Sequence, residues 1–283
     1  AKTLFPYTTL FRSDEWGVRL ATEAHIPLAT LATIPDSVGW STAQWKMTVT
    51  EQTQRATSFV LQGPDGRELT TSVPLLGSFM AANAALAIVM LVESGFDLEH
   101  ISHALSAAGH IDVVIPGRTE IVSGDEGPVF YLDYGHTPDA FSSLLSAVRQ
   151  VTPGKVFFLF GADGDRDTTK RHAMGHIAAA GADVVVITDY HPRSEDPALI
   201  RAALVEGAAS AQSAAVVIEE GDVRSAIARA ISEAGAGDAI VYAGPGHETE
   251  REVAGGTIPF NFREEIHTAL REAGYAPRGE HLS

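Results

Sequence analysis

The sequence predicts an α/β fold whose second half is a doubly wound, mostly parallel sheet. Five short apolar runs recur there, and each is followed by a polar or Gly-rich loop and then by a helical stretch: Val129–Leu132, Val156–Phe160, Val184–Ile187, Ala215–Ile218 and Ala239–Tyr242. This strand–helix alternation favours parallel strands joined by right-handed crossovers. At 283 residues, 45% hydrophobic and 20% charged, the chain has the composition of a globular protein and exceeds the usual size of one core.

The first half predicts a smaller α/β unit. In chain order we expect an amphipathic stretch over 14–24, an apolar run over 27–34, an antiparallel hairpin or small sheet over 46–73, a buried helix over 81–94 and a helix capped by Asp97 that runs to Ala107. Pro116 and Gly117 interrupt the pattern, so a boundary is expected near residues 111–117. We therefore predict two domains, over residues 14–111 and 112–283.

The N-terminal segment differs from the rest of the chain. Residues Thr3 to Ser13 resemble the translation of a widely used sequencing-library adapter. We expect residues 1–13 to be a non-native segment and leave them out of the predicted fold.

Charge and composition exclude several classes of function. The 20 Lys and Arg against 36 Asp and Glu give a formal net charge of −16, which repels nucleic acid and anionic membranes. The absence of cysteine excludes disulfides, thiolate metal sites and cysteine nucleophiles. The longest apolar stretch, Ala84–Val92, is shorter than the ~20 residues that a membrane span needs. We expect a cytoplasmic monomer with no nucleic-acid or membrane partner.

Polar clusters follow four of the five predicted strands. They are Asp133–Asp139, Gly161–Asp167, Thr188–Pro197 and Gly244–Glu248, and Gly117–Glu120 lies upstream of them. Singly, each cluster is ordinary turn chemistry. Together they predict a shared ligand site, because ligands bind beyond the carboxyl ends of parallel strands.

Several well-defined ligand-binding motifs begin in this sequence but are not completed at the positions they require. The run Asp163 to Asp167 starts like a calcium loop, but Thr168 and Met174 stand where glycine and glutamate should follow. The run Gly244 to Gly246 starts like a dinucleotide fingerprint, but Thr249 stands at the third glycine position. The chain has no Gly-rich Walker loop for phosphate. No metal ligand and no catalytic residue is therefore predicted.

Taken together, the clusters resemble motifs of the Mur ligase family, and in particular of those members that act on UDP-N-acetylmuramoyl-L-alanyl-D-glutamate. The resemblance extends from Asp14 to Leu270 and includes Gly117-Arg118-Thr119-Glu120. It implies three domains in the whole enzyme. This chain would hold the end of the central, ATP-binding domain and all of the C-terminal, Rossmann-like domain.

The resemblance implies an ATP site shared by the two domains. Asn83 is similar to the asparagine that binds adenine, although the family often has an earlier asparagine where Met80 stands. Arg118 and Asp133 resemble the residues that reach ATP from the C-terminal domain, and His136 is expected on the same wall. A guanidinium suits phosphate oxygens and a carboxylate suits ribose hydroxyls.

The resemblance also implies an amino-acid site. Residues Asp189–Arg193 are similar to the family's Asp-Asn-Pro-Arg loop, and residues Gly244–Glu248 to its Gly-Lys-Gly-His-Glu loop, with His191 in place of Asn and Pro245 in place of Lys. The expected contacts with the amino acid come from Asp189, His191, Arg193, Gly244 and Glu248. Arg193 favours meso-diaminopimelate, because a second carboxylate suits a guanidinium, while the altered neighbours leave L-lysine open.

The implied reaction is ATP-driven amide formation with Mg²⁺, which adds a diamino acid to UDP-N-acetylmuramoyl-dipeptide. The family's phosphate loop and magnesium ligands would lie upstream of Asp14, so we expect little ligase activity from this polypeptide alone. Two alternatives stay open. One is a related folylpolyglutamate or amino-acid-polymer ligase, and the other is a non-catalytic Rossmann-like binding module.

Overall fold

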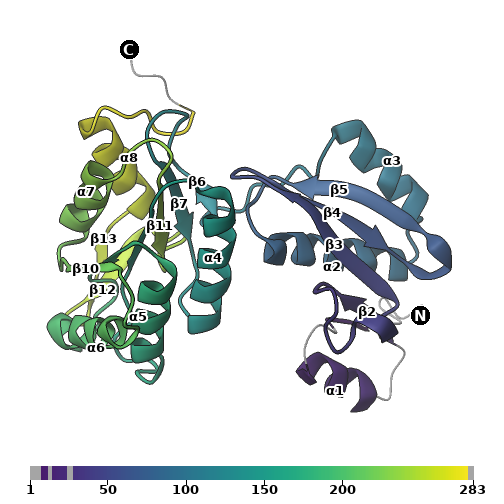
Figure 1. Ribbon diagram of the computed structural model, residues 1–283, viewed down its shortest axis with the longest axis horizontal. Helices are drawn as coiled ribbons and strands as arrows, with labels where there is room; N and C mark the ends of the chain where they lie inside the picture. The colour runs from purple at the N-terminus through teal and green to yellow at the C-terminus, as the bar shows by residue number, and fades with distance from the viewer. Residues whose placement is uncertain (1–7, 12–14, 24–27, 280–283) are drawn as a thin grey trace. The chain divides into compact units, whose positions relative to one another are not determined.

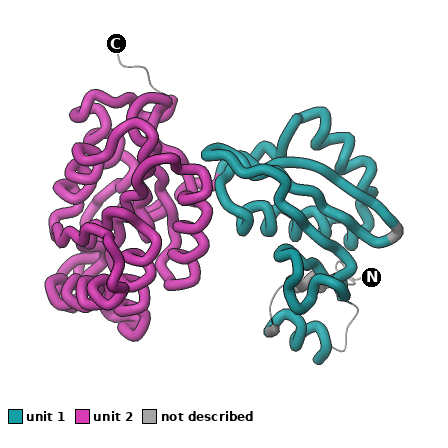
Figure 2. Tube along the Cα trace, in the orientation of Figure 1, with its two compact units in different colours: residues 1–114 teal, residues 115–283 magenta. Residues whose placement is uncertain are grey.

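The structure is a computed structural model that describes residues 8–11, 15–23 and 28–279. The chain divides into two compact units, residues 1–114 and residues 115–283 (Figure 2). Each unit has its own sheet and its own buried apolar cluster. No helix in the described part of the chain is long and apolar enough to cross a membrane.

The first unit is built on a five-stranded sheet in the order β1-β2-β3-β4-β5 (Figure 1). Strands β1, β2 and β3 pair in parallel, and β3, β4 and β5 pair antiparallel. Its elements are β1 (Thr8–Phe11), α1 (Glu15–Glu23), β2 (Leu28–Ala32), η1 (Trp40–Thr42), β3 (Trp45–Gln52), β4 (Thr57–Gln62), η2 (Pro64–Gly66), β5 (Glu68–Val73), α2 (Ser78–Glu93) and α3 (Leu98–Ala108).

Helix α2 packs on this sheet and closes its core. Trp45 on β3 is fully buried, and its indole N–H donates to Glu93 at the end of α2 across 3.0 Å. The predicted antiparallel segment is confirmed as β3 to β5, and the predicted cap of α3 is confirmed because the Asp97 carboxylate accepts the Glu99 N–H at 2.7 Å. Helix α2 begins at Ser78, earlier than predicted.

Part of the segment that sequence analysis left out of the fold is a strand in the structure, while its non-native origin stays a prediction. Thr8–Phe11 forms β1 and pairs in parallel with β2 over four residues. A Thr-Thr-Leu-Phe run has the β-branched and aromatic residue types that suit a strand. The other residues of the segment lie outside the described part of the chain.

The second unit contains a six-stranded sheet in the order β10-β9-β8-β11-β7-β6. All of its pairs are parallel except β6 with β7, which is antiparallel. Its elements are β6 (Glu120–Ile121), β7 (Val129–Asp133), α4 (Pro138–Val151), β8 (Val156–Phe160), α5 (Lys170–Gly181), β9 (Val184–Ile187), α6 (Pro197–Ser210), β10 (Val216–Glu219), α7 (Val223–Glu233), β11 (Ala239–Ala243), the β12 (Glu250–Val253) and β13 (Gly256–Pro259) hairpin, and α8 (Phe262–Glu272).

Helices cover both faces of this sheet, so the predicted doubly wound α/β class is confirmed (Figure 1). On one face α7 and α8 pack against Phe157 and other strand residues in one buried cluster. On the other face the Phe141 ring of α4 lies 4.8 Å from the Phe158 ring and 5.0 Å from the Phe160 ring. Central strands buried on two faces must be apolar throughout, which is why they were visible in the sequence as continuous apolar runs.

The strand order determines where a site can form. Strands β9, β8, β11 and β7 are consecutive in the sheet and parallel, so their carboxyl ends lie at one edge. The segments after them bring four polar loops together: the β7 loop (134–137), the β8 loop (161–169), the β9 loop (188–196) and the β11 loop (244–249).

Candidate functional site

The four loops and strand β12 enclose a cavity of about 520 Å³. Its lining is polar and rich in charged groups: Tyr134, His136, Asp163, Arg166, Tyr190, His191, Arg193, His247, Glu248, Thr249, Glu250 and Glu252. The prediction that the strand ends supply one shared cavity is supported by this geometry for the loops after β7, β8, β9 and β11.

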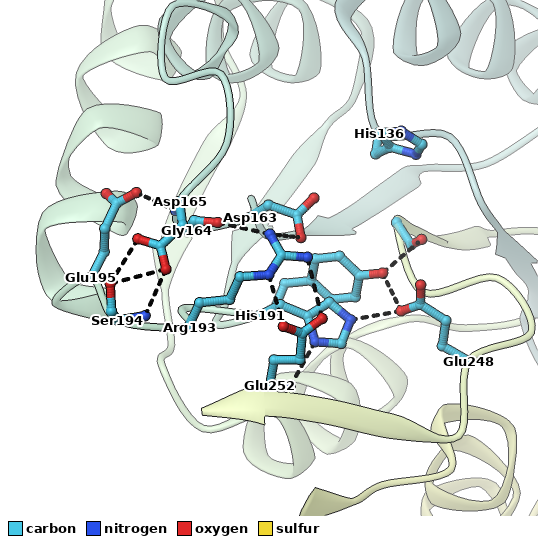
Figure 3. A network of polar contacts seen from close by, with 12 residues as sticks. His136, Asp163, Gly164, Asp165, His191, Arg193, Ser194, Glu195, Glu248 and Glu252 are labelled. Carbon is cyan, nitrogen blue, oxygen red and sulfur yellow. Dashed lines mark hydrogen bonds and ion pairs between the residues drawn. The ribbon is translucent and has the colours of Figure 1, made fainter. Parts of the chain in front are cut away.

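Glu248 is fixed in the cavity by two residues of the β9 loop (Figure 3). Its Oε2 accepts a hydrogen bond from His191 Nε2 at 2.7 Å and another from the Tyr190 hydroxyl. Burial alone would raise the pKa of Glu248, but these two hydrogen bonds outweigh it and hold the pKa below its usual range. The carboxylate is therefore ionised at neutral pH. Its Oε1 points away from His191 (Figure 3).

The hydrogen bonds of His191 define its tautomer. The backbone N–H of Glu252 donates to Nδ1 at 2.8 Å, so Nδ1 is the acceptor and Nε2 carries the proton that goes to Glu248. The ring is buried, with 5% of the residue exposed. Burial also raises the pKa of Tyr190, as does its bond to Glu248, so its hydroxyl stays a donor. A neutral imidazole and a neutral phenol thus orient the carboxylate without cancelling its charge.

Arg193 lies beside this group, between two carboxylates (Figure 3). Its Nε and Nη2 donate to the two oxygens of Glu252 at 3.0 and 3.3 Å, and its Nη1 lies 3.2 Å from Asp163 Oδ1. Nη1 also donates to the Gly164 carbonyl at 2.7 Å. The bonded Arg193 guanidinium holds the pKa of Glu252 below its usual range. In this structure the guanidinium connects the β8 loop, the β9 loop and β12.

Arg171, a buried residue on α5, joins the β8 and β9 loops, because it pairs with Glu195 of the β9 loop and donates to the Asp163 carbonyl of the β8 loop at 2.8 Å. Arg171 on α5 donates through Nη1 and Nη2 to the two carboxylate oxygens of Glu195, each at 2.9 Å, and its side chain is 7% exposed. A Cβ on Gly164 would lie 2.0 Å from the Pro192 carbonyl oxygen, so only glycine allows this approach of the two loops.

Tyr134 forms the wall of the cavity on the β7 side. The Arg118 guanidinium lies 4.7 Å from the centre of its ring, and the rings of His136 and His247 lie 5.1 and 5.6 Å away. His136 is also held by its Nδ1, 2.8 Å from the Tyr134 carbonyl oxygen. Arg118 and His136 are therefore brought together, although only His136 lines the cavity itself.

Asp133 lies beneath that wall and holds loops together. Its Oδ2 accepts the Thr119 N–H at 2.8 Å and its Oδ1 accepts the Gly135 N–H at 2.6 Å. Burial raises the pKa of Asp133, although both backbone N–H groups act in the opposite direction. The residue is 6% exposed and does not line this cavity, and each of its carboxylate oxygens accepts a backbone N–H.

Three other predicted residues lie outside the cavity lining. The Asp189 carboxylate pairs with Arg201 on α6 and does not line the cavity. Gly244 contributes only its backbone, with its carbonyl accepting from the Tyr190 hydroxyl at 3.3 Å. Asn83 is exposed on α2 in the first unit.

Sequence analysis did not assign most of the lining residues to the amino-acid site, and among those it left out are Asp163, Arg166, Tyr190 and Glu252. Tyr190 stands inside the Asp189–Arg193 motif, and its place in that loop was the available signal. Glu252 follows the last motif and has no sequence signal, since it meets Arg193 only through folding.

The three aspartates of the calcium-like run have separate partners. Asp163 faces Arg193, Asp165 accepts from the Ser194 hydroxyl at 2.8 Å, and Asp167 accepts from the Thr169 hydroxyl at 2.6 Å. Within residues 8–11, 15–23 and 28–279, no three His, Cys, Asp or Glu side chains gather in a way that could hold a metal ion.

Comparisons with known proteins define the family of the second unit. Residues 117–246, which carry these loops, match the sequence family described as "Mur ligase, glutamate ligase domain". The second unit is a Mur ligase C-terminal domain. The expected family resemblance is thereby confirmed for the unit that holds the cavity.

The sequence similarity to relatives covers more of the chain than residues 117–246. A UDP-N-acetylmuramyl-tripeptide synthetase of Leifsonia xyli subsp. xyli is 58% identical over 262 residues, which is 93% of this chain and 50% of the relative. A UDP-N-acetylmuramoyl-L-alanyl-D-glutamate–2,6-diaminopimelate ligase of Streptomyces coelicolor is 38% identical over 267 residues, which is 92% of this chain and 50% of the relative.

A solved structure of a UDP-N-acetylmuramoyl-L-alanyl-D-glutamate–2,6-diaminopimelate ligase matches with a TM-score of 0.60 and 27% identity, covering 95% of this chain and 53% of that one. This chain thus spans about half the length of the curated relatives and of the solved structure that it matches.

Proposed function

We propose that this chain is part of an ATP-dependent ligase that adds a diamino acid to UDP-N-acetylmuramoyl-L-alanyl-D-glutamate. The observation that supports it best is Glu248, an ionised carboxylate held by neutral donors at the end of a Mur ligase cavity. Such a group suits an ammonium, and a diamino acid has a second amine that can supply one while the other amine reacts. The names of relatives at 58% and 38% identity agree with this substrate class.

In the proposed complex, the amino acid lies in the cavity with its non-reacting ammonium at Glu248 Oε1. Tyr190 and His191 hold that carboxylate in place by their bonds to Oε2. The guanidinium of Arg166, an exposed residue on the cavity rim, provides a partner for the α-carboxylate. Fixing both ends of the molecule positions its free amine for attack on an activated carboxyl group.

For the nucleotide, we propose Arg118 and His136 as the contribution of the second unit. Both lie at the Tyr134 wall, and a guanidinium there can meet phosphate oxygens. ATP supplies the phosphoryl group that activates the carboxylate, and Mg²⁺ is expected to accompany its phosphates. Asn83 remains a prediction for the adenine. Asp133 is better explained by its bonds to backbone amides than by contact with ribose.

Calorimetric titration of the chain tests the substrate class. We expect L-lysine or meso-diaminopimelate to bind, and L-norleucine, which matches lysine in length but lacks the second amine, to bind at least about tenfold more weakly. Equal affinity for lysine and norleucine, or no binding of either diamino acid, would contradict the proposal. A folate-type ligase or a module without this pocket should give that negative result.

A further inference from the structure

More negative than positive side chains line the cavity. Four carboxylates line it, from Asp163, Glu248, Glu250 and Glu252, against two guanidinium groups, from Arg166 and Arg193. Arg193 favours meso-diaminopimelate only if its guanidinium is free to bind the second carboxylate of that molecule. The structure gives Arg193 other partners.

Both bidentate edges of the Arg193 guanidinium are engaged. The Nε–Nη2 edge donates to the two oxygens of Glu252, and Nη1 on the other edge is shared by the Gly164 carbonyl at 2.7 Å and Asp163 at 3.2 Å. A carboxylate is best held by two parallel N–H groups of one edge. An incoming carboxylate would find no such edge and would approach two existing carboxylates.

The backbone keeps this arrangement in place. The Arg193 N–H donates to the Glu252 carbonyl at 3.1 Å, and Arg193 forms an isolated parallel bridge with Val253. In return the Glu252 N–H donates to His191 Nδ1 at 2.8 Å. Arg193 has a φ of 49°, in the left-handed region that a non-glycine residue adopts only when its surroundings hold it there. Glu252 is thus bonded to the loop by both its backbone and its side chain.

Resting on the function proposed above, we propose that Glu252, together with Asp163, is a specificity determinant that selects a basic diamino acid with a single carboxylate, of which L-lysine is the representative, over meso-diaminopimelate. The single α-carboxylate goes to Arg166, and the ammonium goes to Glu248. The second carboxylate of diaminopimelate binds poorly because the Arg193 guanidinium is already paired with Glu252 and Asp163. Like charges placed together reduce affinity strongly, and discrimination of this kind needs a repulsive element as well as an attractive one.

The experiment is a calorimetric titration of the whole chain with L-lysine and with meso-diaminopimelate, for wild type, Glu252→Gln and Glu250→Gln. Glu252→Gln keeps the backbone bonds and side-chain shape while removing the charge that neutralises Arg193. Glu250→Gln is the matched control, because it removes one carboxylate from the same rim, and Glu250 has an exposed side chain.

We expect wild type to bind L-lysine at least about tenfold more tightly than meso-diaminopimelate, and Glu252→Gln to lose most of that ratio, while Glu250→Gln keeps it. Equal or tighter binding of meso-diaminopimelate by wild type would overturn the inference and leave the proposed ligase function standing. A ratio unchanged in Glu252→Gln would also overturn it. Failure of both amino acids to bind would overturn the proposed function and the inference with it.

Discussion

Replacing Glu248 by Gln removes one negative charge from the cavity and leaves its shape nearly unchanged, so it tests what the charge contributes to binding. Both hydrogen bonds to Glu248 end on one oxygen, Oε2. A glutamine can keep them on its single oxygen, and its amide NH₂ then takes the place of Oε1. The fold around Tyr190 and His191 is therefore preserved, while an ionic acceptor becomes a donor that opposes an ammonium.

The expected size of the effect follows from the surroundings of Glu248. Its side chain is 26% exposed, so solvent weakens the ion pair, and the value for a hydrogen bond to a charged group, about 1.5–3 kcal/mol, is the appropriate scale. That corresponds to about 10- to 150-fold weaker binding of L-lysine. Calorimetry on wild type, Glu248→Gln and Glu250→Gln measures it. A loss of less than threefold, or an equal loss in the Glu250 control, would refute the assignment of the ammonium to Glu248.

Three further predictions follow from the same contacts. Arg171→Ala removes the bidentate partner of Glu195, whose side chain is 29% exposed, and should lower the free energy of unfolding by about 1–2 kcal/mol, measured by urea denaturation. Gly164→Ala places a Cβ 2.0 Å from the Pro192 oxygen and should cost roughly 1–3 kcal/mol, while weakening lysine binding by separating the two loops; unchanged affinity would contradict this. Because the pKa of Glu248 is lowered by folding, its charge stabilises the fold above the ordinary pKa of 4.5, and this contribution is lost as the pH falls from 4.5 through the lowered pKa of the folded state. Wild type and Glu248→Gln should therefore converge in stability in acid, and a gap that does not narrow as the pH falls below 4.5 would contradict this.

The strands of the second unit were predictable because each is marked by the apolar residues of its own short segment. Strands β8 and β9 have the predicted bounds, since a strand buried on both faces is one unbroken apolar run. Strand β10 is shifted by one residue, to Val216–Glu219. It is the edge strand, and three of its four residues are exposed, so its apolar pattern is weaker.

The site was predictable where its residues belong to motifs and unpredictable where folding creates the contact. His191, Arg193 and Glu248 were identified from the loops that follow strands, and they line one cavity. Asp189 belongs to the same motif but points to Arg201, which only the direction of its side chain reveals. Glu252 meets Arg193 from 59 residues away along the chain. No local pattern could indicate that this arginine is already neutralised.

The central claim is that one ammonium of a diamino acid binds at Glu248, between the loops that follow β8, β9 and β11. A crystal structure of the chain with L-lysine tests it most directly. The expected result is a lysine ammonium within hydrogen-bond distance of Glu248 Oε1, with the carboxylate of the same molecule on the side of Arg166. Lysine bound with its carboxylate toward Glu248, or ordered only outside this cavity, would contradict the claim.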